Sequence, residues 1–177
     1  PVFSVDIPKC DKTNTVAVQL RDFRTFTQDF SDRLAQSVVT NFSDKTIEIY
    51  SFQDSIDLKV CLDFENKLKM LNSEIKTQVF SGLSNEEIIS NLSKAQYLIA
   101  MRFHAIIVGL LAGAKVLAIN YDTKVEKLAR EFNLPIIDLK KDFKNQFEEL
   151  KRENINKNLE ICAQKSFDWT NFNRMVE

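Results

Sequence analysis

The sequence predicts an α/β fold: a doubly wound, parallel, six-stranded sheet with helices on both faces. Short β-rich runs alternate six times with segments of helical periodicity. Such alternation requires parallel strands joined by right-handed crossovers. The composition agrees, because 44% hydrophobic and 28% charged residues are typical of a folded chain with a buried core. We expect one domain over residues 1–177, with a sheet core at about 13–140 and a C-terminal helix and tail at 141–177.

Each expected strand is a short run rich in β-branched and aliphatic residues. The six runs are Thr15–Leu20, Thr46–Phe52, Glu74–Phe80, Tyr97–Ala100, Lys115–Ile119 and Pro135–Leu139. Apolar residues at helical spacing predict a helix after each strand. The expected helices span about 23–38, 55–71, 85–95, 103–112, 122–132 and 142–165.

Local patterns place these helices in the fold. The first helix has a phenylalanine-rich apolar stripe formed by Phe23, Phe26, Phe30, Leu34 and Val38. The second has an apolar face formed by Ile56, Val60, Phe64, Leu68 and Leu71. Both stripes are interpreted as core. Ser84 and Glu87 have the spacing of a capping box. Gly109 and Gly113 form a GxxxG spacing, which predicts close packing of the fourth helix on the sheet.

Several classes of function are excluded by bulk features. A net charge of −1 gives no general reason to bind nucleic acid or an anionic membrane. The most apolar stretch, 105–114, is far shorter than the roughly 20 residues of a membrane-spanning helix. The three cysteines Cys10, Cys61 and Cys162 lack CxxC or zinc spacing, so we expect free thiols, no metal and a cytoplasmic location.

No nucleotide-binding loop is present in the sequence. The first strand is followed by Leu20-Arg-Asp-Phe23 rather than GxGxxG, and no P-loop occurs. With only three glycines in the chain, we expect a Rossmann-like sheet without a dinucleotide site of the usual kind.

Polar residues that directly follow the strands indicate a binding site, because ligands of open α/β sheets lie beyond the carboxyl ends of the strands. Arg21 follows the first strand, Arg102 and His104 follow the fourth, and Lys124 follows the fifth. His104 and Lys124 lie 20 residues apart, one helix–strand unit, so neighbouring strands would bring them to equivalent places. Cations at helix amino ends favour a small anion as the ligand.

Structural interpretations of the same residues stay open. His104 can be a structural histidine, and Arg102 an ordinary surface cation. Lys124 can pair with Asp122 or Glu126, and Arg21 can form a surface ion pair with Asp22.

Two blocks of this sequence have a familiar form. Met101-Arg-Phe-His-Ala-Ile-Ile107, followed by Gly113 and Tyr121-Asp-Thr-Lys-Val125, resembles the signature of the polysaccharide pyruvyl transferases. That family carries an M-R-[LF]-H-A-like block and a Y-D-P-K-V-like block about one βα unit apart. The recognisable match runs from about 84 to 132. Thr123 stands where the family usually has proline, at a first helical position where proline is merely favoured.

The resemblance implies a transferase of cell-envelope polysaccharide biosynthesis. It implies transfer of pyruvate from phosphoenolpyruvate to a sugar or glycan acceptor as a cyclic ketal, without a metal or cofactor. Its members are similar to two-lobed GT-B glycosyltransferases, so this chain would be the C-terminal lobe and would face an N-terminal lobe of the same parent chain. The absence of an initiator methionine before Pro1 is consistent with that expectation.

Carried over by position, the resemblance assigns His104 and Lys124 to catalysis. Arg102 then joins them in binding phosphoenolpyruvate, and Arg21 is a further candidate for the cleft. Two alternatives remain open: the donor-binding lobe of a nucleotide-sugar GT-B glycosyltransferase, and a non-catalytic relic domain.

Overall fold

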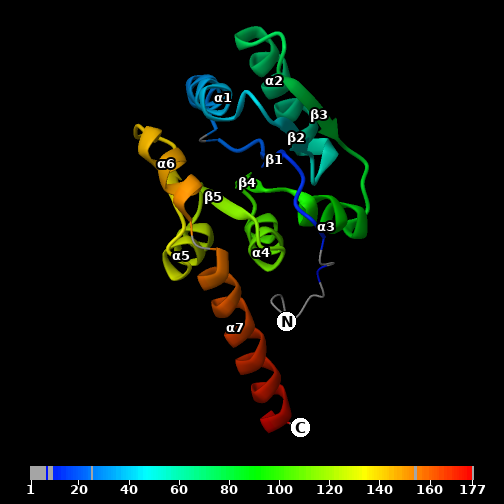
Figure 1. Cartoon of the computed structure of the whole chain (residues 1–177), viewed down its shortest axis with the longest axis vertical. Coiled ribbons are helices and arrows are strands. Elements are labelled where there is room, and N and C mark those ends of the chain that lie inside the picture. The colour runs from blue at the N-terminus through cyan, green and yellow to red at the C-terminus, as the bar shows by residue number, and fades with distance from the viewer. Residues whose placement is uncertain (1–6, 8–9, 25, 154, 177) are drawn as a thin grey trace.

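The computed structural model describes residues 7, 10–24, 26–153 and 155–176, with side chains up to Lys165. Six parallel strands form one sheet, as expected, and their order is β3-β2-β1-β4-β5-β6 (Figure 1). Their boundaries lie within two residues of the expected ones: β1 Thr15–Gln19, β2 Thr46–Tyr50, β3 Lys76–Phe80, β4 Tyr97–Ala100, β5 Lys115–Asn120 and β6 Ile136–Asp138.

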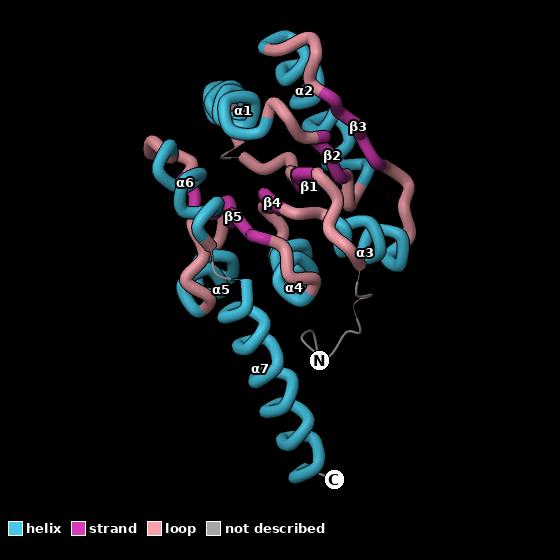
Figure 2. The backbone as a smooth tube through the Cα atoms, viewed as in Figure 1, coloured by secondary structure: helices cyan, strands magenta, loops and turns pink. Residues whose placement is uncertain are grey.

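Helices cover both faces of the sheet, and each layer encloses its own apolar core (Figure 2). One face carries α1 Gln28–Phe42, α2 Asp54–Leu71 and α6 Lys144–Arg152. The other face carries α3 Asn85–Lys94, α4 Phe103–Leu111, α5 Thr123–Glu131 and the start of α7 Ile155–Val176. The prediction of a doubly wound fold is therefore confirmed.

The chain reverses its direction of growth across the sheet between β1 and β4. In register, Gln19 is paired with Tyr50 of β2 on one side and with Ala100 of β4 on the other. Ala100 is in turn paired with Ala118 of β5. The loops after β1, β2, β4 and β5 therefore open on one edge of the sheet, at the switch point where doubly wound folds bind ligands.

The first helix starts later than its phenylalanine stripe predicts. The α1 helix begins at Gln28 because the Thr27 hydroxyl oxygen accepts a hydrogen bond from the Phe30 amide at 3.2 Å, the geometry of an N-cap. Phe23 and Phe26 precede the helix, so the predicted span 23–38 was wrong at its start. Phe23 packs edge-on against Tyr121 instead, with ring centroids 5.1 Å apart.

The buried face of α2 also differs from the expected one. The residues of α2 that are buried are Asp57, Cys61, Phe64 and Leu68. Leu71, which was expected on this face, is 45% exposed. The face is therefore rotated toward Asp57, and the reason is the partner that this carboxylate finds in the interior.

The long C-terminal helix expected at 142–165 is two helices, so that prediction was wrong. The α6 helix ends at Arg152, and Glu153 turns its side chain back to the sheet. The Glu153 carboxylate accepts hydrogen bonds from the Val116 amide and from Asn158 Nδ2, both at 2.5 Å. Phe147 and Leu150 of α6 are fully buried, so this segment belongs to the core rather than to a peripheral tail.

The two glycines of the GxxxG spacing have different roles. An added Cβ at Gly109 would lie 2.4 Å from Leu98 Cδ2 and 3.2 Å from Val116 Cγ2, so α4 packs closely on β4 and β5 as predicted. Gly113 instead has φ +69° just after the helix, a conformation that glycine adopts without strain. The capping box of Ser84 and Glu87 is confirmed. Within the described part of the chain, no helix is long and apolar enough to cross a membrane.

The three cysteines are free thiols, as expected. Cys61 and Cys162 are buried, whereas Cys10 is partly exposed. Burial raises the pKa of Cys61 to about 12 and that of Cys162 to about 11, so both remain protonated near neutral pH. Within the described residues, no group of three or more His, Cys, Asp or Glu side chains is placed to hold a metal ion.

We expect Gly109→Ala to lower the free energy of unfolding by about 1–3 kcal/mol, the usual cost of overpacking a filled core. The added methyl group would meet Leu98 and Val116, whose side chains are buried. Denaturant unfolding measures the change, with Gln36→Ala on the exposed side of α1 as a control that stays within about 0.5 kcal/mol. A more stable Gly109→Ala protein, as helix propensity alone predicts, would contradict this packing.

Glu153 gives stability a pH dependence of known sign. Burial raises its pKa from 4.5 to about 7, against hydrogen bonds from Val116 and Asn158 that lower it. Because the folded protein holds this proton more tightly, the stabilisation is complete below pH 4.5 and is lost as pH rises through 7. The free energy of unfolding should fall by up to about 3 kcal/mol over that range.

Urea unfolding at pH 4.5 and pH 8 tests this contribution. Glu153→Gln should be less sensitive to pH than the unsubstituted protein, because an amide does not titrate. Glu149→Gln, an exposed change in α6, the helix that Glu153 directly follows, is the matched control and should keep the full dependence. Equal pH dependence in the two variants would show that Glu153 is not responsible.

Candidate functional site

The candidate residues lie at the carboxyl edge of the sheet, where loops leave the three central strands. Arg21 follows β1, Arg102 and His104 follow β4, and Lys124 follows β5. Because β1, β4 and β5 are consecutive in the sheet, the condition under which His104 and Lys124 come to equivalent places, that the fourth and fifth strands are neighbours, is met. Both α4 and α5 begin at this edge, so the positive dipole ends of the two helices face the same region.

Arg102 forms a buried ion pair with Asp57, which lies in the first turn of α2. The Arg102 Nε and Nη2 atoms donate to the Asp57 carboxylate at 2.8–3.0 Å. The Asp57 side chain is 0% exposed and the Arg102 side chain 18% exposed. Paired, fork-like contacts of this kind are among the strongest hydrogen bonds in proteins. Arg102 is therefore largely neutralised within the protein rather than left as a surface cation.

Two glutamines complete the network around this pair. The Gln19 side chain, fully buried at the end of β1, accepts from the Arg102 amide at 2.8 Å and donates to the Leu20 carbonyl at 2.7 Å. The main-chain amide of Gln53 donates to Asp57 Oδ2 at 3.2 Å. The loops after β1, β2 and β4 are thus fastened to one another, and the amino end of α4 is held at a fixed place.

Asp57 is a residue of the site that sequence reasoning missed. Its signal was present, because Asp57 lies on the same helical face as Cys61, Phe64 and Leu68, at spacings of four, seven and eleven. An acidic residue on an apolar helical face is buried only with a partner, and such a pattern could have pointed to Arg102.

Arg21 lies between aromatic rings and not in an ion pair with Asp22. Its guanidinium carbon is 5.9 Å from the centre of the Phe23 ring and 5.8 Å from that of Tyr121. The Arg21 amide donates to the sulfur of Met101 at 3.3 Å. Arg21 Nε is buried and has no hydrogen-bond partner among the described residues. The aromatic rings orient this cation without cancelling its charge.

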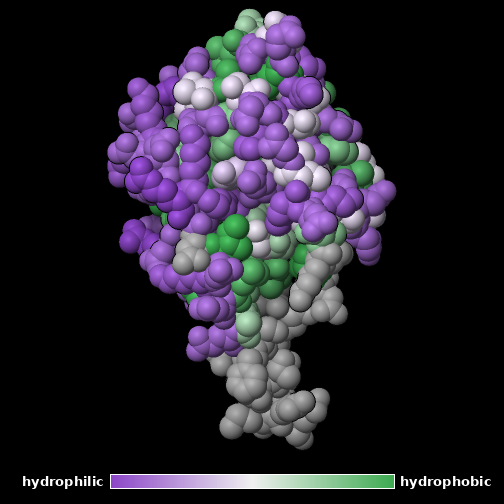
Figure 3. All heavy atoms as spheres, viewed as in Figure 1, coloured by the Kyte–Doolittle hydropathy of each residue, from purple (hydrophilic) through white to green (hydrophobic). Residues whose placement is uncertain are grey.

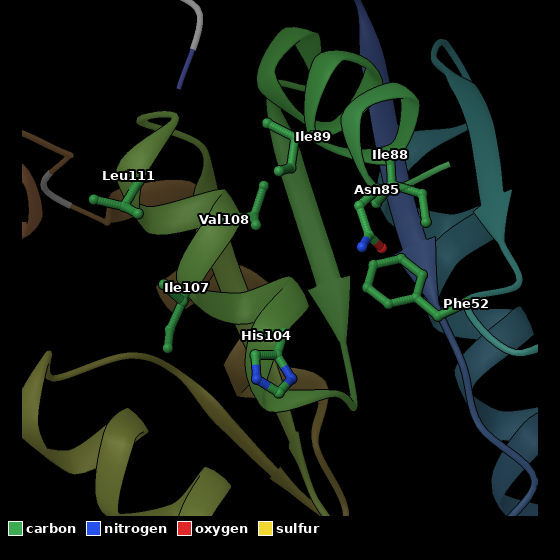
Figure 4. Close-up of a pocket in the computed structure, with 8 residues that line it drawn as sticks. All are labelled: Phe52, Asn85, Ile88, Ile89, His104, Ile107, Val108 and Leu111. Carbon is green, nitrogen blue, oxygen red and sulfur yellow. The ribbon is translucent and has the colours of Figure 1, made fainter. Parts of the chain in front are cut away.

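His104 is exposed at the second position of α4 and lines a pocket between α3 and α4 (Figure 4). Its ring packs edge-on against Phe103, with ring centroids 5.7 Å apart. No hydrogen bond of its side chain is found among the described residues. The imidazole therefore presents its nitrogens to solvent and to any bound molecule.

Lys124 occupies the equivalent second position of α5. Asp122 caps that helix, accepting from the Lys124 and Val125 amides at 2.9 Å. Glu126 pairs with Arg130 at 2.7 Å. Both acids that could have neutralised the Lys124 ammonium are thus engaged elsewhere, and no ion pair of Lys124 occurs among the residues described.

The structure therefore separates the four candidates into two kinds. His104 and Lys124 are exposed at one edge of the sheet, and the partly buried Arg21 keeps its charge unpaired with an acid there. Arg102 instead uses its guanidinium to hold Asp57 and its main chain to open α4. Available cations beside two helix amino ends favour binding of a small molecule with two anionic groups.

The fold is a Rossmann-like α/β lobe, and its structural neighbours are GT-B glycosyltransferases. A TarM mutant from S. aureus, solved with fondaparinux, α-GlcNAc-glycerol and UDP, aligns with a TM-score of 0.57 and 13% identity over 90% of this chain and 33% of that one. A mutant O-GlcNAc transferase from Thermobaculum terrenum aligns at 0.52 and 9% identity, covering 92% and 36%. This chain thus spans about a third of their length, and at such identities the likeness shows the fold alone.

The family assignment comes from the sequence. Residues 4–123 match the family model for polysaccharide pyruvyl transferase, and the chain belongs to that family. The match includes Arg21, Arg102 and His104 and ends one residue before Lys124. No individual curated protein matches the chain. The resemblance seen in the two sequence blocks is thereby confirmed.

Asp57→Asn should lower the free energy of unfolding by about 3–5 kcal/mol, because it leaves the buried Arg102 guanidinium without a counter-charge. Asp63→Asn in the same helix removes the exposed ion pair with Lys59 and should cost less than about 1 kcal/mol. Guanidinium chloride unfolding of both variants measures the difference. Similar losses in the two would show that burial of the Arg102–Asp57 pair has no special weight.

Proposed function

We propose that this chain is the donor-binding lobe of a pyruvyl transferase that takes pyruvate from phosphoenolpyruvate and attaches it to a sugar as a cyclic ketal. The observation that carries the proposal is the family match over 4–123, which covers the edge of the sheet with Arg21, Arg102 and His104. Arg21, His104 and Lys124, none of which pairs with an acid among the described residues, support it, because phosphoenolpyruvate carries both a carboxylate and a phosphate. A second lobe would close the cleft, as in GT-B proteins.

The proposed reaction makes two C–O bonds at one carbon. One sugar hydroxyl attacks C2 of phosphoenolpyruvate while the methylene carbon gains a proton and becomes the methyl group. The bond between C2 and the phosphate oxygen breaks, and inorganic phosphate leaves. The second hydroxyl then closes the ring at C2. The two hydroxyls release two protons, of which one balances the proton added to carbon and the other leaves with phosphate or solvent.

In this proposal, His104 supplies the proton to the methylene carbon or holds the phosphate as an imidazolium. Lys124 clamps the carboxylate or the phosphate from the first turn of α5. Arg21, whose guanidinium is oriented by Phe23 and Tyr121, contributes its positive charge to the same region. Arg102 acts beside them mainly by fixing the start of α4, from which His104 projects.

Phosphoenolpyruvate should bind this chain, and His104→Ala and Lys124→Ala should each weaken binding by about 10-fold to 100-fold. That range corresponds to the loss of one hydrogen bond to a charged group, about 1.5–3 kcal/mol. Isothermal titration calorimetry gives the dissociation constants. Lys127→Ala removes an exposed lysine from the same helix and should leave the affinity unchanged.

A parallel titration with UDP-sugars distinguishes the nucleotide-sugar alternative. Binding of a UDP-sugar without binding of phosphoenolpyruvate would overturn the proposed donor. Phosphate release that depends on both phosphoenolpyruvate and a sugar, and that His104→Ala abolishes, would establish the transfer in the parent protein.

A further inference from the structure

A pocket of about 420 Å³ lies between α3 and α4, and His104 forms part of its wall. Polar side chains are confined to one end of it. Asn85 is the first residue of α3 and His104 the second of α4, so both lie at the carboxyl edge of the sheet. Phe52, from the loop after β2, joins them there. Figure 4 shows Phe52 and His104 at one end, with Ile89 and Leu111 toward the other.

The rest of the pocket wall is aliphatic. Beyond the first turn of each helix, the lining side chains are Ile88, Ile89, Ile107, Val108 and Leu111. Ile88 and Ile107 are buried, and Ile89, Val108 and Leu111 are partly exposed. Figure 3 shows hydrophobic residues gathered over α4 on the face turned to the viewer. From His104 to Leu111 the helix rises about 10 Å, which sets the length of the trough.

We propose that this groove binds the acceptor, and that the acceptor is an amphiphile with a sugar at the His104 end and an apolar aglycone along the trough. The proposal rests on the function proposed above, because it takes His104 as the residue beside which the sugar hydroxyls react. Phe52 offers an aromatic face to the C–H surface of the sugar. The Asn85 amide can donate to and accept from its hydroxyls.

The gradient of polarity selects this occupant. A longer glycan laid along the trough would press hydroxyl groups against Ile107, Val108 and Leu111 without hydrogen-bond partners, at a cost in desolvation. A wholly apolar ligand would desolvate Asn85 and His104 in the same way. An amphiphile satisfies both ends, and sites for small molecules typically combine an apolar wall with a few placed polar groups.

Binding of three probes tests the proposal: methyl β-D-galactopyranoside, hexyl β-D-galactopyranoside and 1-hexanol, titrated separately and followed by NMR. Each methylene buried in the trough should tighten binding about fourfold. We therefore expect the hexyl glycoside to bind at least 30-fold more tightly than the methyl glycoside and also more tightly than hexanol.

Variants locate the effect. Val108→Asp places a charge in the trough and should remove most of the advantage of the hexyl chain. Phe52→Ala should weaken binding of both glycosides. Leu62→Asp is the matched control: Leu62 is a 44% exposed leucine on α2, on the opposite face of the sheet, and its change should leave all affinities as they are. Thermal unfolding verifies that each variant is folded.

Three results would overturn the proposal. Equal affinity for the methyl and hexyl glycosides would leave the trough without a role. Hexanol binding as tightly as the hexyl glycoside would make the groove a plain hydrophobic docking face. A loss in Leu62→Asp equal to that in Val108→Asp would place binding elsewhere. Phosphoenolpyruvate titration of the unsubstituted protein is independent of all three, so failure of the donor assignment is recognised separately.

Discussion

Arg102 and Asp57 come from elements on opposite faces of the sheet and meet above the end of β1. The α2 helix leaves β2 on one face, whereas α4 leaves β4 on the other. An unpaired charge at this depth would cost several kcal/mol, so the two side chains constrain each other's backbone. The Gln19 side-chain oxygen also accepts a hydrogen bond from the main-chain amide of Arg102. The direction in which α4 departs, and with it the place of His104, depends on this pair.

The Arg102–Asp57 pair also gives Arg102 a different role from Arg21 and Lys124, although the three cations look alike in the sequence. Arg102 gives its charge to the interior, whereas Arg21 is oriented by two aromatic rings that leave its charge unneutralised. Lys124 remains available because Asp122 serves the helix amides and Glu126 serves Arg130. The edge of the sheet therefore combines a rigid support with groups that can still respond to a ligand, which is the arrangement that pre-organised binding requires.

The sheet could be predicted from the sequence because parallel strands buried on both faces form short continuous apolar runs, which stand out between amphipathic helices. Features that depend on contacts between residues far apart in the sequence could not be predicted in this way. The break between α6 and α7 has no glycine or proline to announce it and follows from the contact of Glu153 with Val116. Asp57 is buried through a residue 45 positions away. The edge carrying Arg21, His104 and Lys124 was predictable, whereas the trough beside His104 needs two helices in place.

Glu153 binds a main-chain N–H, and this choice of partner affects how the protein can change in evolution. The hydrogen bond uses the Val116 main-chain N–H and no atom of the Val116 side chain. Position 116 can therefore vary among residues that fit the core without disturbing the junction of α6 and α7. Proline alone would abolish the donor. Sequence drift at position 116 of β5 is thus uncoupled from the hydrogen bond that Glu153 makes at the junction with the last helix.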